Sequence, residues 1–222
     1  MCLSGCFFVV MTGYEVQSKY GFFNIEKIVQ TFYYIQSHSS ANTKLEFIKF
    51  LFFADRIHIR KHFSFISFDY YVAMKYGPVA STSLDVLNKS DRLDVFPDDE
   101  LKFLDYIGIL NKAERIIKDV SNDLLSKNEM SSLDKSIKLF SNIKLIDISH
   151  DYPEWKRYRE CFQYNPNFSQ PIVIDDFFSN PDVNDSPAIQ KYFDSVDPLF
   201  EDIDYLNEAK EFYLDSIRNY VR

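Results

Sequence analysis

Apolar residues recur with the period of a helix in several stretches of this sequence. Over residues 25–35 they stand three or four positions apart, on one helical face that follows the cap-competent Asn24. A second helix is predicted to begin after Thr43, which can form a capping box with Glu46. Over residues 45–59 apolar residues occupy nearly every face, so we expect this second helix at the centre of the core.

The pattern changes after Lys61 to aromatic and β-branched residues. We predict that residues 63–73 form a short extended hairpin rather than a helix. Gly77 and Pro78 then punctuate the chain. Pro78 can open a third helix, because its missing N–H is not needed in a first helical turn.

The middle of the chain gives weaker signals. Residues 99–107 are predicted to be helical, and an extended pair is expected near Ile109 and Ile116. Ser131 or Ser132 is expected to cap a further helix, because serine hydroxyls accept hydrogen bonds from the first free N–H groups.

Negative charge is concentrated near the C-terminus. The chain carries 25 Lys and Arg against 33 Asp and Glu, a net charge of −8. Residues 175–208 hold ten acidic residues and one basic residue, Lys191, so this segment accounts for the whole negative excess. The segment is punctuated by prolines, and we expect an appendage whose last part, residues 205–217, is an amphipathic helix able to pack on the body.

These patterns predict a mainly α protein: a compact helical domain with a short β-hairpin, followed by an acidic C-terminal helical extension. We place a non-core leader at residues 1–13, the domain at 14–165 and the extension at 166–222, and either Met1 or Met11 serves as the start. Only 5 of 222 residues are glycine, which argues against a glycine-rich phosphate loop or a dinucleotide fingerprint.

Charge and cysteine content exclude several classes of function. A pI near 5.0 disfavours binding to nucleic acid and to anionic membranes, since both require a positive surface. No apolar run approaches the roughly 20 residues that a membrane span needs. Three cysteines cannot form a disulfide framework and are typical of a reducing compartment, so we expect a cytoplasmic protein.

Two groups of polar residues have the residue types of a catalytic or metal site. Asp55, His58 and His62 would share one face of the second helix, but no fourth ligand is marked, so we favour a polar network and predict no metal. His150 beside Asp151 is more typical of a helix end than of an acid–base pair. No side chain stands in a nucleophile motif, and we predict neither an enzyme nor a cofactor.

Two blocks of the sequence resemble the Panacea domain of SocA-like antitoxins. The more specific block joins residues 51–61 to residues 69–81, and the weaker one joins residues 130–134 to the Ser-His…Trp segment that ends at Trp155. The chain departs from the family at Phe63 and Phe68, where glycines are usual, so its turn must differ. The family motif positions, which we expect to be mostly structural, are Ala54, Asp55, His58, Asp69, Tyr71, Val72, Ala73, Gly77, Pro78, Val79, Ser149, His150 and Trp155.

The resemblance implies a bacterial or phage-borne antitoxin that binds and neutralises a toxin encoded beside it. One branch of the family delivers its toxin to a protease, which makes a proteolytic adaptor an alternative and a protease a second implied partner. A nucleic-acid-binding regulator is a further alternative, because aromatic residues interleave with lysines and arginines on the second helix. No membrane partner is expected, and self-association stays open.

A surface that binds another protein is expected to use aromatic anchors. The candidates around the predicted hairpin are Phe63, Phe65, Phe68, Tyr70 and Tyr76. The acidic segment 175–208 would attract a basic toxin and speed the encounter. The alternative is that the motif residues pack the hairpin against the second helix and mark the fold alone.

Overall fold

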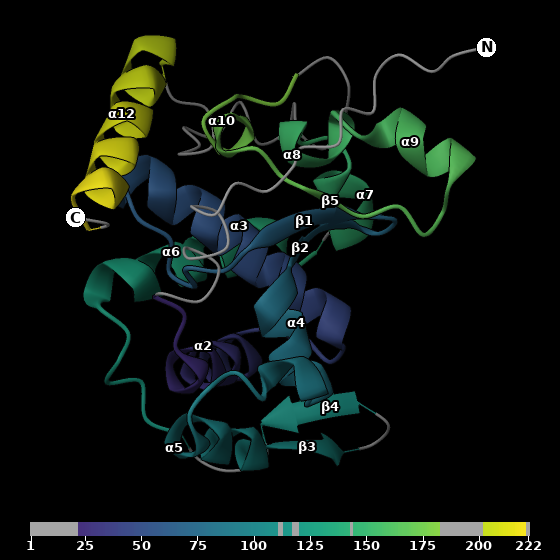
Figure 1. Cartoon of the computed structure of the whole chain (residues 1–222), viewed down its shortest axis with the longest axis vertical. Helices are drawn as coiled ribbons and strands as arrows, with labels where there is room; N and C mark the ends of the chain where they lie inside the picture. The colour runs from purple at the N-terminus through teal and green to yellow at the C-terminus, as the bar shows by residue number, and fades with distance from the viewer. Residues whose placement is uncertain (1–21, 111–112, 117–119, 143, 183–201, 221–222) are drawn as a thin grey trace.

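The computed structural model describes residues 22–110, 113–116, 120–142, 144–182 and 202–220 (Figure 1). Within these residues the protein is mostly helical, with one three-stranded antiparallel sheet and one separate two-stranded hairpin. The predicted fold class is therefore confirmed. The leader 1–13 and most of the acidic segment 175–208 lie outside the described residues.

The helices and strands follow one another in a simple order. The helices are α2 (Ile25–His38), α3 (Lys44–His62), α4 (Ser81–Asn88), α5 (Asp98–Leu101), α6 (Lys127–Phe140), α7 (Leu145–Ser149), α8 (Pro153–Lys156), α9 (Arg159–Tyr164), α10 (Ile174–Phe177) and α12 (Ile203–Tyr220), with the 3₁₀ turns η1 (Asp91–Leu93) and η2 (Lys102–Tyr106). The larger sheet has the strand order β2 (Gly77–Ala80), β1 (Tyr71–Met74) and β5 (Gln170–Pro171), and the smaller one pairs β3 (Ile107–Leu110) with β4 (Ala113–Ile116).

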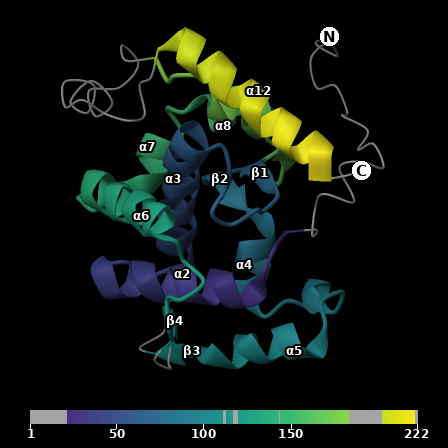
Figure 2. The ribbon, with the colours of Figure 1, turned by 90° about the vertical axis from the view of Figure 1, so that its left-hand side faces the viewer.

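Helix α3 is the centre of the molecule, as predicted. It begins with a complete capping box, in which Thr43 N–H donates to Glu46 (3.0 Å) and Glu46 N–H donates to the Thr43 hydroxyl (3.2 Å). Every residue over 47–60 is buried. Helix α3 is surrounded by α2, α6, α12 and strand β2 (Figure 2). These elements shield most of its length from water.

The hairpin lies further along the chain than the predicted range of residues 63–73. Its strands are β1 and β2, paired from Tyr71↔Ala80 to Met74↔Gly77, while residues 63–69 form a loop. Gly77 and Pro78 belong to β2 and do not open a helix. Pro78 is tolerated there because β2 is the edge strand of its sheet.

Two further predictions in the middle of the chain have opposite outcomes. The extended pair near Ile109 and Ile116 is confirmed as β3 and β4. The predicted cap of α6 is wrong, because Ser126 caps this helix and forms a capping box with Glu129. The sequence contains the Ser-x-x-Glu signature of this cap, with its serine five residues before Ser131.

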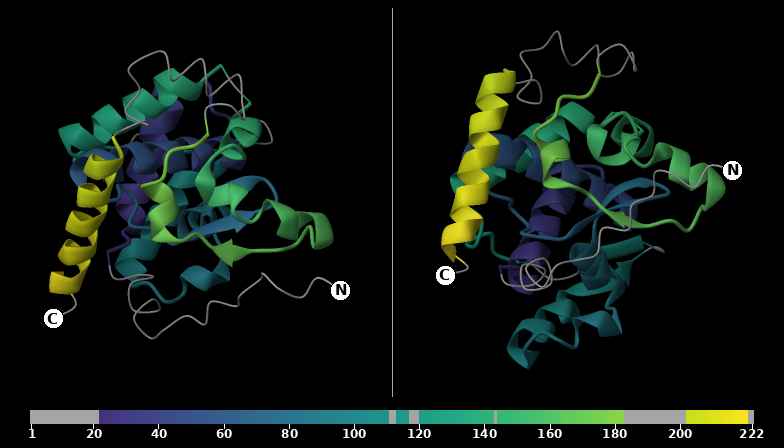
Figure 3. Two further views of the ribbon diagram at one scale, coloured as in Figure 1. Left: turned by 90° about the horizontal axis from the view of Figure 1, so that it is seen from above. Right: turned by 45° about the horizontal axis from the view of Figure 1, so that its top comes forward.

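The residues that follow α9 return to the body of the protein. Strand β5 joins the sheet beside β1, and helices α10 and α12 both contact α3. Figure 3 shows α12 at one end of the molecule and α9 at the other. Among the described helices, no stretch has both the length and the apolar character needed to cross a bilayer.

Candidate functional site

Asp55 on α3 organises the loop that leads into the hairpin. Its carboxylate accepts from the backbone N–H groups of Ile66 (2.5 Å) and Ser67 (3.1 Å). It also accepts from the hydroxyls of Ser67 and Tyr71, the latter at 2.7 Å. Burial raises the pKa of Asp55 to about 6, although these hydrogen bonds favour the charged form. Asp55 thus holds both the loop and the start of β1 against α3.

Asp69 caps a helix to which it does not belong. Helix α4 follows Ala80, whose side chain cannot accept a hydrogen bond. The Asp69 carboxylate accepts instead from the N–H groups of Thr82 (2.9 Å) and Ser83 (2.6 Å). Two of the free donors at the start of α4 are satisfied in this way.

The entry into β2 is built on a glycine and a buried lysine. Gly77 has a φ of +100°, and a Cβ at this position would overlap Lys49 Nζ and Ser149 Oγ. Lys49 is fully buried and donates from Nζ to the Pro78 carbonyl at 2.7 Å. Burial lowers the pKa of Lys49 well below its usual value. Sequence reasoning missed Lys49, although a single lysine inside an apolar run was a usable signal.

A stack of rings fixes the end of the β1–β2 hairpin. The Trp155 indole N–H donates to the Met74 carbonyl at 2.9 Å. The rings of His150 and Phe162 lie parallel to the indole, with centroids 3.7 Å and 5.4 Å away. Burial lowers the pKa of His150 to about 4, so its ring is neutral at pH 7. Beside this rigid base, Tyr76 is 53% exposed at the hairpin end.

The residues of the conceivable metal face do not converge on one point. Asp55 is bonded to the loop, whereas His58 Nδ1 lies 3.1 Å from the Ser132 hydroxyl on α6. The His62 ring centroid is 4.6 Å from that of His58, and burial lowers the pKa of His58 to about 4. In the part of the chain that the structure describes, no three His, Cys, Asp or Glu side chains could hold a metal ion together.

Two arginines on α3, which the sequence suggested as part of an accessible basic stripe, are buried instead and bind the chain beyond α9. Arg56 pairs with Glu154 on α8 and donates to the Asp176 carbonyl at 3.1 Å. Arg60 donates through Nε to the Phe177 carbonyl at 2.8 Å. Burial raises the pKa of Glu154 to about 7, against the opposing effect of Arg56. Both guanidinium groups are inside the protein and join α3 to α10.

The aromatic residues expected to bind a partner lie in different environments; they are Phe63, Phe65, Phe68, Tyr70 and Tyr76. Tyr76 is the most exposed of them, Phe65 is buried, and the other three are partly buried. Phe63 and Phe68 have φ values of 57° and 49°, in the left-handed region that an aromatic residue rarely adopts. The structure therefore separates a free hairpin end from a covered face that contains Phe63 and Phe65.

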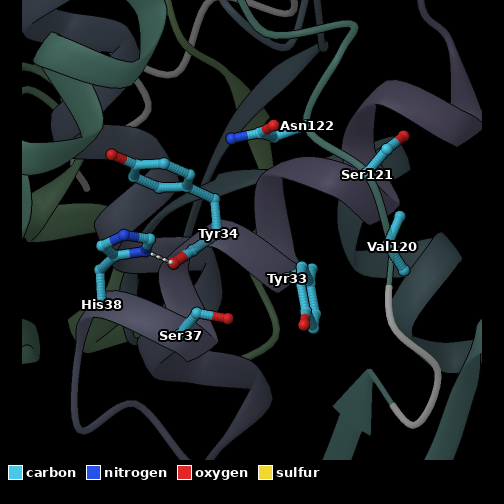
Figure 4. Close-up of a pocket in the computed structure, with 7 residues that line it drawn as sticks. All are labelled: Tyr33, Tyr34, Ser37, His38, Val120, Ser121 and Asn122. Atoms are coloured by element: carbon cyan, nitrogen blue, oxygen red, sulfur yellow. Dashed lines mark hydrogen bonds between the residues drawn. The ribbon is translucent and has the colours of Figure 1, made fainter.

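A shallow pocket lies between α2 and the segment before α6 (Figure 4). Its lining residues are Tyr33, Tyr34, Ser37, His38, Val120, Ser121 and Asn122. His38 donates from Nδ1 to the Tyr34 carbonyl at 2.9 Å, and the two rings stack with centroids 4.1 Å apart. The imidazole thus satisfies the end of α2 and is not aimed at a nucleophile.

Comparison with protein families identifies the central part of the chain. Residues 47–156 match the family model described as the SocA-like antitoxin, Panacea domain. The match runs from α3 to α8 and confirms the resemblance seen in the sequence. Comparisons with curated proteins and with solved structures gave no match.

Proposed function

The chain belongs to the SocA-like antitoxin family through its Panacea domain at residues 47–156, and from this membership we propose that it neutralises a cognate toxin by binding it directly. The observation that carries the proposal is the exposed Tyr76 on a rigidly held hairpin end. An exposed tyrosine with apolar neighbours is a common anchor of protein–protein interfaces.

The hairpin end is prepared for binding before a partner arrives. Trp155 holds the Met74 carbonyl, and Lys49 holds the Pro78 carbonyl on the other strand. Since its backbone is already ordered, a toxin that contacts this end pays little conformational entropy. Lys75 lies over the Tyr76 ring, 5.3 Å from its centroid, and adds a cation to the surface.

The hairpin end and α9, which lie on the same side of the molecule, carry further exposed residues. Met74 is 37% exposed beside Tyr76, and Tyr164 is 85% exposed at the end of α9. Figure 1 shows α9 and the hairpin end on one side, and β5 pairs with β1 where the chain returns from α9. These residues give an interface a mixed aromatic and aliphatic centre.

The titratable residues of the domain support binding over catalysis. Asp55 and Asp69 accept hydrogen bonds from backbone N–H groups. Lys49 donates to a backbone carbonyl, and His58 contacts a serine on α6. Each of these groups stabilises the fold at a fixed position. The polar side chains of the motif thus hold the hairpin in place.

The test is the toxin affinity of Tyr76→Ala. The toxin encoded in the adjacent reading frame is co-expressed with the wild type or with Tyr76→Ala. The affinity of each for the toxin is measured by calorimetry. We expect binding weaker by about tenfold or more, and reduced rescue of growth, because an exposed anchor is lost without a change in the core. Val95→Ala, at a residue 67% exposed in the loop after η1, is the matched control. Equal affinity in Tyr76→Ala would remove the hairpin end from the interface.

The same experiment separates the adaptor mechanism from direct occlusion. Direct neutralisation predicts a stable complex and rescue in cells that lack the relevant protease. Rescue that disappears in such cells would favour delivery of the toxin to that protease. A salt-dependent shift of duplex DNA by the protein alone would instead favour a regulator.

A further inference from the structure

Tyr205 and Lys210 make polar contacts between helix α12 and the body. The Tyr205 hydroxyl donates to the Arg60 carbonyl at 2.8 Å, close to the C-terminal end of α3. Lys210 pairs with Asp175 at 2.8 Å, and the Asp175 side chain is largely exposed. An exposed pair of this kind adds about 1 kcal/mol at most. The Lys210–Asp175 pair therefore adds little to the attachment of α12.

The apolar contact of α12 is narrow as well. Among the described residues of this helix, only Leu206 and Ala209 are buried. Phe212 stacks on Phe63 with a centroid distance of 5.3 Å, yet 64% of Phe212 is exposed. The contact is small compared with that of α6, which packs along α3 with its full apolar face.

Helix α12 has internal features that stabilise it as a helix. Asp202 accepts from the backbone N–H of Asp204 at 2.8 Å and so caps the first turn. Arg218 pairs with Asp215 three residues earlier at 2.9 Å. Part of the stability of α12 is therefore local to the helix and does not depend on its contacts with the body.

The surface beneath α12 has a defined chemistry. Phe63 keeps a left-handed backbone at φ 57°, which costs energy for an aromatic residue, and its ring lies on the outer face. The Tyr213 ring packs edge-on against Phe65 at 5.7 Å and also contacts Phe178. We call this surface the α12 seat; it consists of Phe63, Phe65, Phe178, the Arg60 carbonyl and the Asp175 carboxylate.

We propose that the α12 seat is a helix-binding surface, that α12 is its displaceable cover, and that an amphipathic helix of the toxin takes the place of α12. The seat selects a narrow apolar stripe for the phenylalanines, a hydroxyl donor for the Arg60 carbonyl and a cation for Asp175. Only the identity of the partner rests on the proposed function. The seat lies at the opposite end of the molecule from α9 (Figure 3), so it is separate from the surface around Tyr76.

The hold of the seat on α12 is tested with two matched glycine substitutions. Phe63→Gly and Phe68→Gly both relieve a left-handed aromatic residue, since glycine adopts these φ values readily. Only Phe63 contacts α12, whereas the Phe68 ring lies against Phe22. Hydrogen exchange in α12 of the full-length protein is expected to become about tenfold faster in Phe63→Gly and to stay unchanged in Phe68→Gly. Unchanged exchange in both variants would overturn the role of Phe63 in the seat.

Binding of a helix from outside is tested without any toxin. Leu206→Asp in the full-length protein places a charge under α12 and releases it. A synthetic peptide of residues 202–220 is then titrated into this variant. We expect it to bind at least about tenfold more tightly than it binds the wild type, whose seat is filled. The same peptide carrying Leu206→Asp is the control, and failure of the unaltered peptide to bind would overturn the seat as a helix-binding surface.

The toxin arm decides what occupies the seat. Toxin affinity is expected to rise about tenfold in Leu206→Asp, because the toxin no longer has to displace α12, and the 202–220 peptide is expected to compete with the toxin. Unchanged affinity would overturn the toxin helix as the occupant. If Leu206→Asp does not fold, Tyr205→Phe, which removes the hydroxyl bonded to the Arg60 carbonyl, is the second variant for the same peptide and toxin titrations. If neither the wild type nor Leu206→Asp binds a toxin, the proposed function fails. The titration with the 202–220 peptide still shows whether the α12 seat binds a helix.

Discussion

Gly77 stands where the hairpin, α3 and the end of α7 approach one another most closely. Its positive φ and the closeness of Lys49 Nζ and Ser149 Oγ leave no room for a side chain. Gly77→Ala should lower the free energy of unfolding by about 3 kcal/mol or more, through both overlap and backbone strain. Chemical denaturation measures this loss. Gly108→Ala, in β3, is the control and should change stability by less than about 1 kcal/mol.

His58 gives the protein a dependence on acid whose direction is fixed by its burial. Its pKa is lowered from 6.5 to about 4, so the unfolded chain binds a proton between these values that the folded protein does not. Stability from this group is present above pH 6.5 and is lost as the pH falls towards 4. Relative to His58→Gln, the wild type should lose on the order of 3 kcal/mol over this window, as measured by denaturation at several pH values.

Two buried acids act in the opposite direction. The raised pKa values of Asp55 and Glu154, about 6 and about 7, mean that their contribution to stability is present at low pH and lost as the pH rises through these values. Both acids are present in the wild type and in His58→Gln, so their effects cancel in the comparison. An identical pH profile for the two proteins would contradict the burial of His58.

Helix α4 has no capping side chain of its own at its start. Asp69 supplies its cap from the loop before the hairpin, so the helix, the loop and β2 depend on one carboxylate. Asp69→Ala should lower stability by about 1–2 kcal/mol and speed hydrogen exchange at the start of α4. Asp91→Ala, in η1, removes an exposed acid nearby and should leave exchange in α4 unchanged.

Helix ends and helix faces were predictable where the signal was local. The capping box of α3 and the amphipathic face of α2 are properties of a few neighbouring residues, and both were found. The aromatic residues of 63–69 predict a strand, because aromatic residues are frequent in strands, but these residues form a loop. Their conformation is set by Asp55 on α3, which lies 11 residues before Ile66, and the alternation of residues 63–69 alone does not carry that information.

At the scale of the whole molecule, the chain beyond the matched domain completes the core. The carbonyls that accept from Arg56 and Arg60 lie in α10, and Phe177 is buried against Phe65 with a centroid distance of 5.0 Å. Sequence reasoning placed this segment in an appendage, because the partners of the two arginines lie more than 100 residues away. Motif residues such as Gly77 were singled out in advance, whereas these pairings required the fold.

Truncation tests this dependence. A chain that ends at residue 165 would deprive two guanidinium groups of their carbonyl partners and would lose the buried Phe177, at a combined cost of about 5 kcal/mol or more. We expect it to lack a cooperative thermal transition, because that cost is comparable to the stability of a typical domain. A chain that ends at residue 182 keeps α10 and should unfold cooperatively. Equal transitions for the two truncated chains would show that the segment is dispensable.

Chemical labelling of the buried Lys49 amine can also measure how often the hairpin opens. An acylating reagent in solution cannot reach Nζ while β2 lies on α3. Burial lowers the pKa of this amine well below its usual value, and an opening of the hairpin exposes Nζ to the reagent. The acylation rate of Lys49 therefore reports how often β2 separates from α3. Toxin bound at the hairpin end would lower this rate.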